Sequence, residues 1–491
     1  MIDMMNPLPT TDLVRAAPPL EFAAALEMLA SLAYIAVATL AFLSGWLSCE
    51  GAVVLTAALL LLLLILAYKR FDGGRHPCFF FLGTLTLFQG GRLVAFLAGG
   101  DFELRQITLL TWYQFAVSRD VLGLALLSIA LSALCIYAPC RWSYGAFSPP
   151  CNQALGRYLP YLYVLLWLSV PVQLYKNFRY YEYAREHGGY LVLFLDHGGM
   201  AASIPIAVRA ISLISLPAFV GIFVLEERKL RLRIATAVYF TITAPVLLTG
   251  SRGAIFSLLL SLCYVAKVKS GKIARPLKMG LAGVGLVMIA TLIGSLRNKG
   301  SESLHFAGTA QFMADQGASF NVTEVAIAYR GRFAPYVTSY LASELQSAFV
   351  APDQAHYTLG RHFNDDMAMF LNPTDFLLGH GTGSTYLAEA YLLGGLWGIM
   401  LVSGLLGALL HGMHAHSRNP LQLFLIAMIL PDVLWMARGG LLDWVSASAR
   451  VGISMLLLWL GWHLYRAIAR IGCVLWRTDC LIDHRPHSPG F

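Results

Sequence analysis

Long apolar runs without a single charge constrain this chain more than any other feature. The segments from Ala52 to Tyr68 and from Met279 to Leu296 are of this kind, and a helix needs about 20 mainly apolar residues to cross the hydrocarbon core of a bilayer. Charged residues make up 13% of the chain, against about 25% in a typical soluble protein. We therefore predict an all-α polytopic membrane protein.

Hydropathy along the chain predicts about twelve transmembrane helices of roughly 20 residues each. The expected spans are 21–46, 51–68, 78–98, 120–139, 159–176, 200–225, 234–250, 253–268, 278–296, 384–411, 420–437 and 444–465. We find no repeat at the periods typical of solenoid proteins. No removable signal peptide is expected at the start, so the first helix is expected to act as an uncleaved anchor.

Basic residues in the short loops predict the orientation. Lys and Arg gather after the second, sixth and eighth expected spans, at 69–75, 228–233 and 267–278. With twelve spans these loops fall on one side, which the positive-inside rule makes cytoplasmic. Both termini are then cytoplasmic, and the net charge of +8 reflects topology instead of a nucleic-acid partner.

The expected spans divide the chain into four parts. Transmembrane helices 1–9 occupy residues 1–296, a long external loop with amphipathic helices occupies 297–383, helices 10–12 occupy 384–465, and a cytoplasmic tail occupies 466–491. A polar connection of nearly ninety residues is unusual in a compact membrane protein. Such long loops commonly carry function.

Cysteine and carboxylate patterns favour neither a disulfide framework nor a metal centre. None of the eight cysteines forms a CxxC pair, which is the spacing typical of many zinc sites. A ligand set of His362, Asp365 and Asp366 is possible by spacing but nonspecific. We expect no metal and no cofactor.

External arginines are the informative anomaly, because the positive-inside rule disfavours them. Arg252 lies between the seventh and eighth spans, Arg330 and Arg332 lie in the long loop, and Arg438 lies between the last two spans. The planar guanidinium group matches the paired oxygens of a diphosphate. A lipid diphosphate at the membrane surface is the ligand class that this set favours, although pairing with Asp432, Asp443 or Glu324 would explain any single arginine.

Two glycine-rich segments accompany these arginines. Gly250 and Ser251 precede Arg252 in a tight turn, and Gly381 and Gly383 lie in a segment of glycines and hydroxyl residues just before the tenth span. Glycine lets the backbone approach a ligand closely, and successive backbone amides can bind phosphate. We therefore include these four residues as candidate substrate contacts.

Ionisable residues near the tenth span are candidates for proton transfer. His380 and Glu389 flank its start, and a carboxylate at a membrane-embedded position is costly unless it has a partner. A general base must lie within hydrogen-bonding reach of the acceptor hydroxyl, which the sequence does not establish. We rank Glu389 and His380 as candidates, whereas Asp443 is expected to orient Arg438.

The order of these motifs resembles the Wzy polymerases of bacterial surface polysaccharides, especially those of the enterobacterial common antigen type. The motifs are the Gly250-Ser251-Arg252 turn, the long loop with Arg330, the glycine-rich entry to the tenth span, and Ala437-Arg438-Gly439 followed by Asp443. The resemblance extends over roughly residues 200–460. The pattern around His380 and Glu389 departs from that of the family.

This resemblance implies a membrane glycosyltransferase similar to the C-type enzymes. Such an enzyme would transfer a growing glycan from undecaprenyl diphosphate to a lipid-linked repeat unit at the periplasmic face of the bacterial inner membrane. Carried over by position, Arg252, Arg330 and Arg438 would act on the diphosphate or in catalysis, with Arg332 as a weaker neighbour. A chain-length regulator and a repeat-unit flippase would be its partners.

Two other activities compete with this interpretation. An O-antigen ligase shares the architecture and the external arginines, but it transfers finished chains to lipid A–core. A flippase for lipid-linked sugars would instead carry charges inside its spans and show inverted repeats. Here the charges gather in external loops and no inverted repeat is evident, so the flippase ranks behind the ligase.

Overall fold

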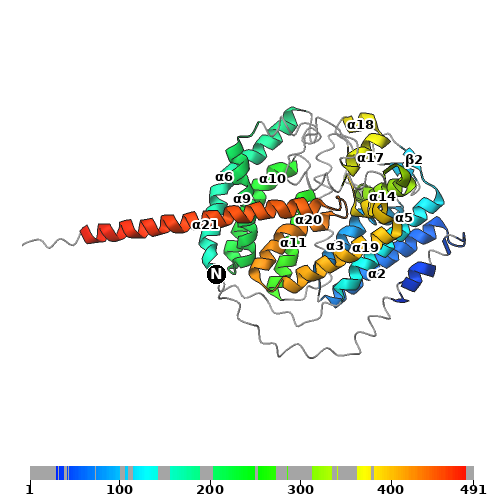
Figure 1. Ribbon diagram of the computed structural model, residues 1–491, viewed down its shortest axis with the longest axis horizontal. Coiled ribbons are helices and arrows are strands. Elements are labelled where there is room, and N and C mark those ends of the chain that lie inside the picture. The colour runs from blue at the N-terminus through cyan, green and yellow to red at the C-terminus, as the bar shows by residue number, and fades with distance from the viewer. Residues whose placement is uncertain are drawn as a thin grey trace, which may run out of the picture.

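The computed structural model shows a helical bundle from which one long helix extends (Figure 1). It describes residues 29–99 except 31, 38–40, 43 and 72, together with 106–108, 114–141, 155–187, 203–248, 253–271, 285, 312–333, 340, 362–377 and 381–482. The helices of the first half are α2 (Cys49–Arg70), α3 (Pro77–Phe88), α4 (Gly91–Leu97), α5 (Arg119–Cys140), α6 (Leu159–Glu186), α9 (Ile206–Leu225), α10 (Lys229–Leu248) and α11 (Gly253–Ser270).

Shorter and longer helices alternate in the second half. They are α14 (Ala318–Ala328), α15 (Arg330–Phe333), α17 (Phe363–Leu371), α18 (Pro373–Leu377), α19 (Tyr386–His416), α20 (Pro420–Trp435) and α21 (Asp443–Ile482). A 3₁₀ turn, η2 (Gly156–Tyr158), precedes α6. Strands β1 (Gln106–Thr108) and β2 (Gln114–Ala116) pair antiparallel, with Ile107 opposite Phe115.

Side-chain caps begin several of the long helices. Ser48 accepts a hydrogen bond from the amide of Gly51 at the start of α2, and Ser118 accepts one from Val121 at the start of α5. Asn419 caps α20 in the same way. Such caps satisfy backbone amides that have no partner within the helix, so local sequence sets these helix starts.

The fold class predicted from hydropathy is confirmed. Within the described residues, seven helices are long and apolar enough to cross a membrane, or eight if the bent pair α3 and α4 forms one span. The expected span at 278–296 lies outside the described residues apart from residue 285, and 21–46 is described only in part. Twelve spans, the division of the chain at 297, 384 and 466, and the orientation of the termini stay predictions.

Two breaks interrupt spans that hydropathy presents as continuous. The axes of α3 and α4 differ by 57° across Gln89 and Gly90. Helix α19 is kinked at Gly394 and Gly395, and Gly395 has a φ of 61°, a left-handed conformation that favours glycine. Hydropathy does not detect such breaks because glycine is common in apolar segments.

Part of the region expected to be a polar loop is packed inside the bundle. Every residue of α14 from Ser319 to Ile327 is buried, and this helix lies against α5, α19 and α3. Val322 and Val325 share a core cluster with Phe333, Phe363 and Met367 of the same region. The region therefore contributes its own core to the molecule.

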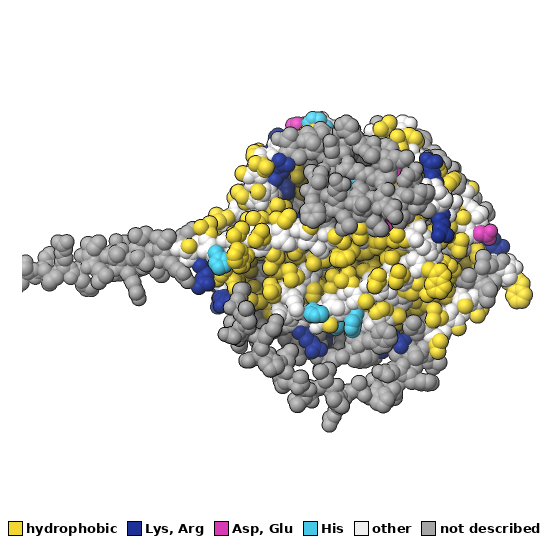
Figure 2. All heavy atoms as spheres, viewed as in Figure 1, with side chains coloured by type: hydrophobic (Ala, Val, Ile, Leu, Met, Phe, Trp, Pro, Cys, Tyr) yellow, Lys and Arg dark blue, Asp and Glu magenta, His cyan; other side chains and the backbone are white. Residues whose placement is uncertain are grey.

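The exterior is apolar where a bilayer would surround it. On the described part of the face in Figure 2, hydrophobic side chains form a band, and Lys and Arg appear toward its margins. Large side chains in this exterior include Trp397, 78% exposed, and Leu401, 65% exposed. Contiguous exposed apolar surface of this kind indicates contact with lipid.

Helices α5 and α19 approach each other closely at Gly407, which yields a prediction about stability. A Cβ atom added at Gly407 would lie 2.5 Å from the carbonyl oxygen of Ile136, whereas one at Gly404 meets nothing within 4 Å. We expect Gly407→Ala to destabilise the protein by about 1–3 kcal/mol, the usual cost of overpacking. Thermal unfolding in detergent measures this effect, with Gly404→Ala as the matched control; equal melting temperatures for the two variants would contradict it.

Candidate functional site at the Arg438 turn

A buried polar seam joins three regions that are distant in the sequence. The side chain of Gln89, at the break between α3 and α4, donates to Thr385 Oγ1 (2.8 Å) and to the carbonyl oxygen of Ala437 (3.1 Å). Thr323 of α14 donates to Gln89 Oε1 (3.3 Å). All three polar side chains are fully buried, so the seam positions the turn at residues 437–440 against the start of α19.

The glycine-rich segment at 381–385 lies beside this turn. The amide of Tyr386 donates to the carbonyl of Met436 (3.2 Å), and Thr385 Oγ1 donates to Ala437 (3.3 Å). Gly383 has a φ of 73° and is exposed, as is Gly381. Two motifs separated by more than fifty positions in the sequence therefore form one surface.

Two carboxylates hold the turn through its backbone amides. Glu389 Oε2 accepts from the amide of Leu441 (3.0 Å), while Glu389 Oε1 accepts from Ser384 Oγ (2.5 Å). Asp443 Oδ2 accepts from the amide of Gly440 (2.8 Å). A Cβ at position 439 would lie 2.3 Å from Asp443 Oδ2 and 2.9 Å from the Trp435 ring, so a side chain there would displace the Asp443 carboxylate or the ring.

The side-chain amide of Gln316 and two aromatic rings contact Arg438. Its Nη1 donates to Gln316 Oε1 (2.9 Å), and its Cζ lies 5.6 Å from the ring centroid of Phe88 and 5.9 Å from that of Trp435. Cation–π contacts of this kind stabilise a guanidinium where water is scarce. The side chain is partly exposed, so it presents a fixed positive charge at the ends of α3 and α20.

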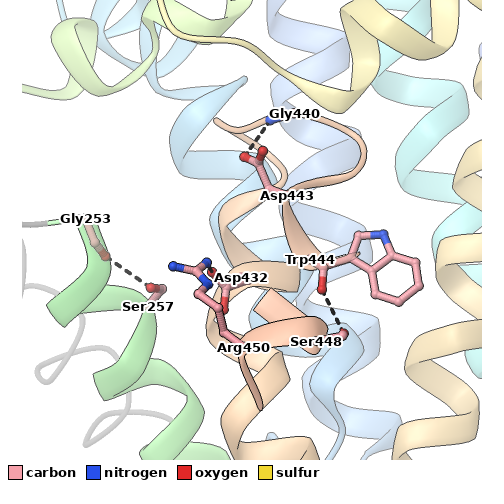
Figure 3. Close-up of polar contacts among 8 residues, drawn as sticks. All are labelled: Gly253, Ser257, Asp432, Gly440, Asp443, Trp444, Ser448 and Arg450. Carbon is pink, nitrogen blue, oxygen red and sulfur yellow. Dashed lines mark hydrogen bonds and ion pairs between the residues drawn. The ribbon is translucent and has the colours of Figure 1, made fainter. Parts of the chain in front are cut away.

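The start of α11 meets the same region. A Cβ on Gly253 would lie 2.4 Å from the ring of Trp435, which places the residue after Arg252 against an aromatic neighbour of Arg438. Figure 3 shows Gly253 and Ser257 facing the ion pair of Asp432 and Arg450, whose atoms lie 3.8 Å apart. Asp432 is thus paired with an arginine other than those predicted for the site.

Arg330 lies at the kink of α19. Its Cζ is 5.5 Å from the ring centroid of Tyr391, and its Nη1 would be 3.6 Å from a Cβ on Gly395. Arg332 stacks instead on Phe370, with its Cζ 4.4 Å from the ring centroid. Both arginines are exposed.

Helix α14 separates the two predicted arginine positions. Gln316, the partner of Arg438, precedes α14, and Arg330 follows it. The 11 residues of this helix span about 16 Å at 1.5 Å per residue. Arg330 and Arg438 therefore place positive charge at two separate positions beside the first part of α19, so they do not both bind one phosphate group.

A buried charged network anchors α14 to α4. The side-chain oxygen of Asn321 accepts from Arg92 Nη1 (2.8 Å), and its side-chain nitrogen donates to Glu324 Oε2 (3.2 Å). Burial raises the pKa of Glu324 well above its usual range, and the positive charge of Arg92 opposes this shift. A Cβ on Gly317 would lie 2.2 Å from the amide nitrogen of Arg92, so this glycine lets the chain beside Gln316 contact α4 directly.

The predicted site residues are thus only partly gathered. The structure brings Arg438, Glu389, Asp443, Gly381 and Gly383 to one end of the bundle, and it puts Arg330 and Arg332 beyond α14. Arg252, Gly250, Ser251 and His380 lie outside the described residues. The aromatic and charged segment at 180–186, which follows the expected span 159–176, lies on the last turns of α6.

Sequence reasoning did not identify the residues that hold Arg438 and its turn. Gln316, Gln89, Phe88 and Trp435 carry no charge and belong to none of the motifs described above, so no pattern in the sequence marks them. The available signal was Arg92, a charged residue inside the expected span 78–98 that needs a partner there, together with Glu324 as a candidate partner for an arginine.

Comparison with known proteins identifies the family. The family model described as O-antigen polysaccharide polymerase Wzy matches residues 28–466. No curated protein and no solved structure matches the chain. Because the match covers nearly the whole chain and the structure is a polytopic helical bundle, the protein belongs to the Wzy family of O-antigen polysaccharide polymerases.

Proposed function

We propose that this polymerase transfers a growing glycan from undecaprenyl diphosphate to a hydroxyl of a lipid-linked repeat unit, at the periplasmic face of the bacterial inner membrane. The anomeric carbon of the donor sugar forms a bond to the acceptor oxygen, and its bond to the diphosphate breaks. The acceptor hydroxyl gives its proton to a base or to water, and undecaprenyl diphosphate leaves. The observation that carries the proposal is Arg438, held by Gln316 beside the exposed segment at 381–383.

Fixed cations suit this reaction because negative charge develops on the leaving diphosphate. A positioned guanidinium stabilises that charge without reorganising during the reaction. We assign Arg438 to the leaving diphosphate, with backbone amides near Gly381 and Gly383 as further donors. Arg330 would bind a second anionic group, such as the diphosphate of the acceptor lipid, and Arg252 stays a candidate for the same surface.

The experiment that tests the proposal is deletion of the gene in its host, followed by analysis of surface glycan and lipid-linked intermediates. We expect single repeat units, exposed at the periplasmic face, in place of long chains. Long chains that stay on undecaprenyl diphosphate would indicate the ligase alternative, and repeat units confined to the cytoplasmic leaflet would indicate a flippase. A chain-length regulator and a repeat-unit flippase are the expected partners, which crosslinking in the same host would test.

Glu389 serves, in this proposal, to position the turn, because both of its oxygens already accept hydrogen bonds. Glu389→Gln keeps the size of the side chain and one carbonyl oxygen, so we expect activity within about tenfold of the wild type. Glu389→Ala removes both acceptors and is expected to cost more. A general base typically contributes about 10²–10⁴-fold, so a loss of that size in Glu389→Gln, at unchanged protein level, would make Glu389 the base.

A further inference from the structure

We propose that His76, Cys78 and Cys140 form a zinc site at the end of the bundle opposite the Arg438 turn. Among the described residues, the potential ligand atoms of these three side chains all lie within 4.8 Å of one another. Each side chain is fully buried. This site differs from the candidate catalytic region and departs from the expectation that the chain holds no metal.

The three residues come from two helices that are far apart in the sequence. His76 and Cys78 flank the first residue of α3, where His76 caps the helix, and Cys140 is the last residue of α5. Zinc–sulfur bonds of about 2.3 Å in a tetrahedral site place the two sulfurs about 3.8 Å apart. Bringing the ligand atoms from within 4.8 Å to this spacing requires a shift of about 1 Å or less, which side-chain rotation can supply.

A fourth ligand is within reach on α19. The ring centroid of His414 lies 4.5 Å from that of His76, and Cys140 Sγ donates to the carbonyl oxygen of Gly407 on the same helix (3.2 Å). Two cysteines and two histidines are a common ligand set for structural zinc. Zinc here would join the ends of α3, α5 and α19.

The net charge of the metal and its ligands favours zinc among the metals that bind thiolates. Two thiolates and neutral imidazoles around Zn²⁺ sum to zero charge, and burial penalises any net charge. Copper(I), the other soft candidate, would leave one negative charge uncompensated at this buried position. Binding releases the two thiol protons to solvent, so one Zn²⁺ replaces two protons and the charge of the site stays the same.

The helix cap and the metal compete for the single basic lone pair of the neutral His76 ring. His76 Nδ1 now accepts from the amide of Cys78 (3.0 Å). When zinc takes this lone pair, the amide becomes available to donate to a thiolate, an interaction that orients metal ligands. The metal-free and zinc-bound forms therefore differ by a local exchange of partners at the start of α3.

The test uses the full-length protein in detergent. Elemental analysis after purification without chelators is expected to give about one zinc per chain. After removal of the metal, titration with Co²⁺ is expected to produce the strong near-ultraviolet absorption of cobalt–thiolate bonds and the visible bands of tetrahedral cobalt. Added Zn²⁺ should abolish both signals and raise the melting temperature.

Variants distinguish this site from adventitious binding. Cys78→Ser and Cys140→Ser should each lose the cobalt–thiolate signal, whereas Cys263→Ser, which alters an exposed cysteine, should keep it. If the first two variants do not fold, the wild-type titration still decides the question. Absence of zinc, of a cobalt–thiolate band and of a thermal shift in the wild type would overturn the proposal, as would a signal that only Cys263→Ser removes.

Discussion

Arg438→Ala is expected to reduce polymerisation by about 10²–10³-fold while the protein stays in the membrane at its normal level. The estimate follows from the loss of one preorganised charge partner of a developing anion. The variant also vacates the space between Phe88, Trp435 and Gln316, which hold the guanidinium. The measurement is the chain-length distribution of surface glycan in a deletion strain that carries the variant.

Two companion variants separate chemistry from packing. Arg438→Lys keeps the charge but loses the planar fork that binds two oxygens at once, so we expect partial activity with shorter chains. Arg157→Ala changes an exposed arginine in η2 and should leave the distribution unchanged. Wild-type chain lengths in Arg438→Ala, at equal protein level, would remove Arg438 from the proposed mechanism.

Glu324→Ala is expected to destabilise the folded protein by about 1–3 kcal/mol, because it removes the acceptor of the Asn321 side-chain amide and one of two acidic neighbours, with Asp315, of the buried Arg92 guanidinium. Arg92 is 4% exposed and Glu324 is fully buried, so water does not replace the lost partner. Thermal unfolding in detergent and the steady-state level in membranes measure the effect. Glu186→Ala, at an exposed position, should change stability by no more than about 0.5 kcal/mol.

The double variant Arg92→Met, Glu324→Leu tests the same network by removing both charged side chains at once. Replacing a buried charged pair by apolar residues of similar volume is often neutral or stabilising, so we expect the double variant to be more stable than Glu324→Ala. The amide of Asn321 then loses both partners, which leaves some cost. A double variant less stable than Glu324→Ala would show that the charges contribute more than their burial costs.

The variant pairs also connect stability with the site. Arg92 and Gly317 bring the chain next to Gln316 against α4, and Gln316 holds Arg438. Relative to the wild type, the polymerase activity of Glu324→Ala should therefore decrease by a larger factor than its protein level in the membrane. Activity strictly proportional to protein level would separate the network from the site.

Much of the fold could be predicted from the sequence because hydrophobicity is a local property. Apolar runs such as Ala52–Tyr68 require a span wherever they lie in the chain, and the structure contains α2 there. The same local logic predicted the turns around Arg438, because glycine and arginine between two spans mark a membrane end. The order of these motifs was enough to identify the family, although each motif is short.

Only the tertiary structure decided which of these ends meet and what holds them. The seam of Gln89, Thr323 and Thr385 joins residues more than 200 positions apart, and the kink at Gly395 brings a backbone position close to Arg330. No sequence pattern encodes such contacts, because a buried hydrogen bond depends on two distant partners being desolvated together. The sequence by itself determined that this chain spans a membrane and carries arginines between its apolar segments; packing between helices decided that Arg438 contacts Phe88 and Trp435, with Arg330 at the other end of α14.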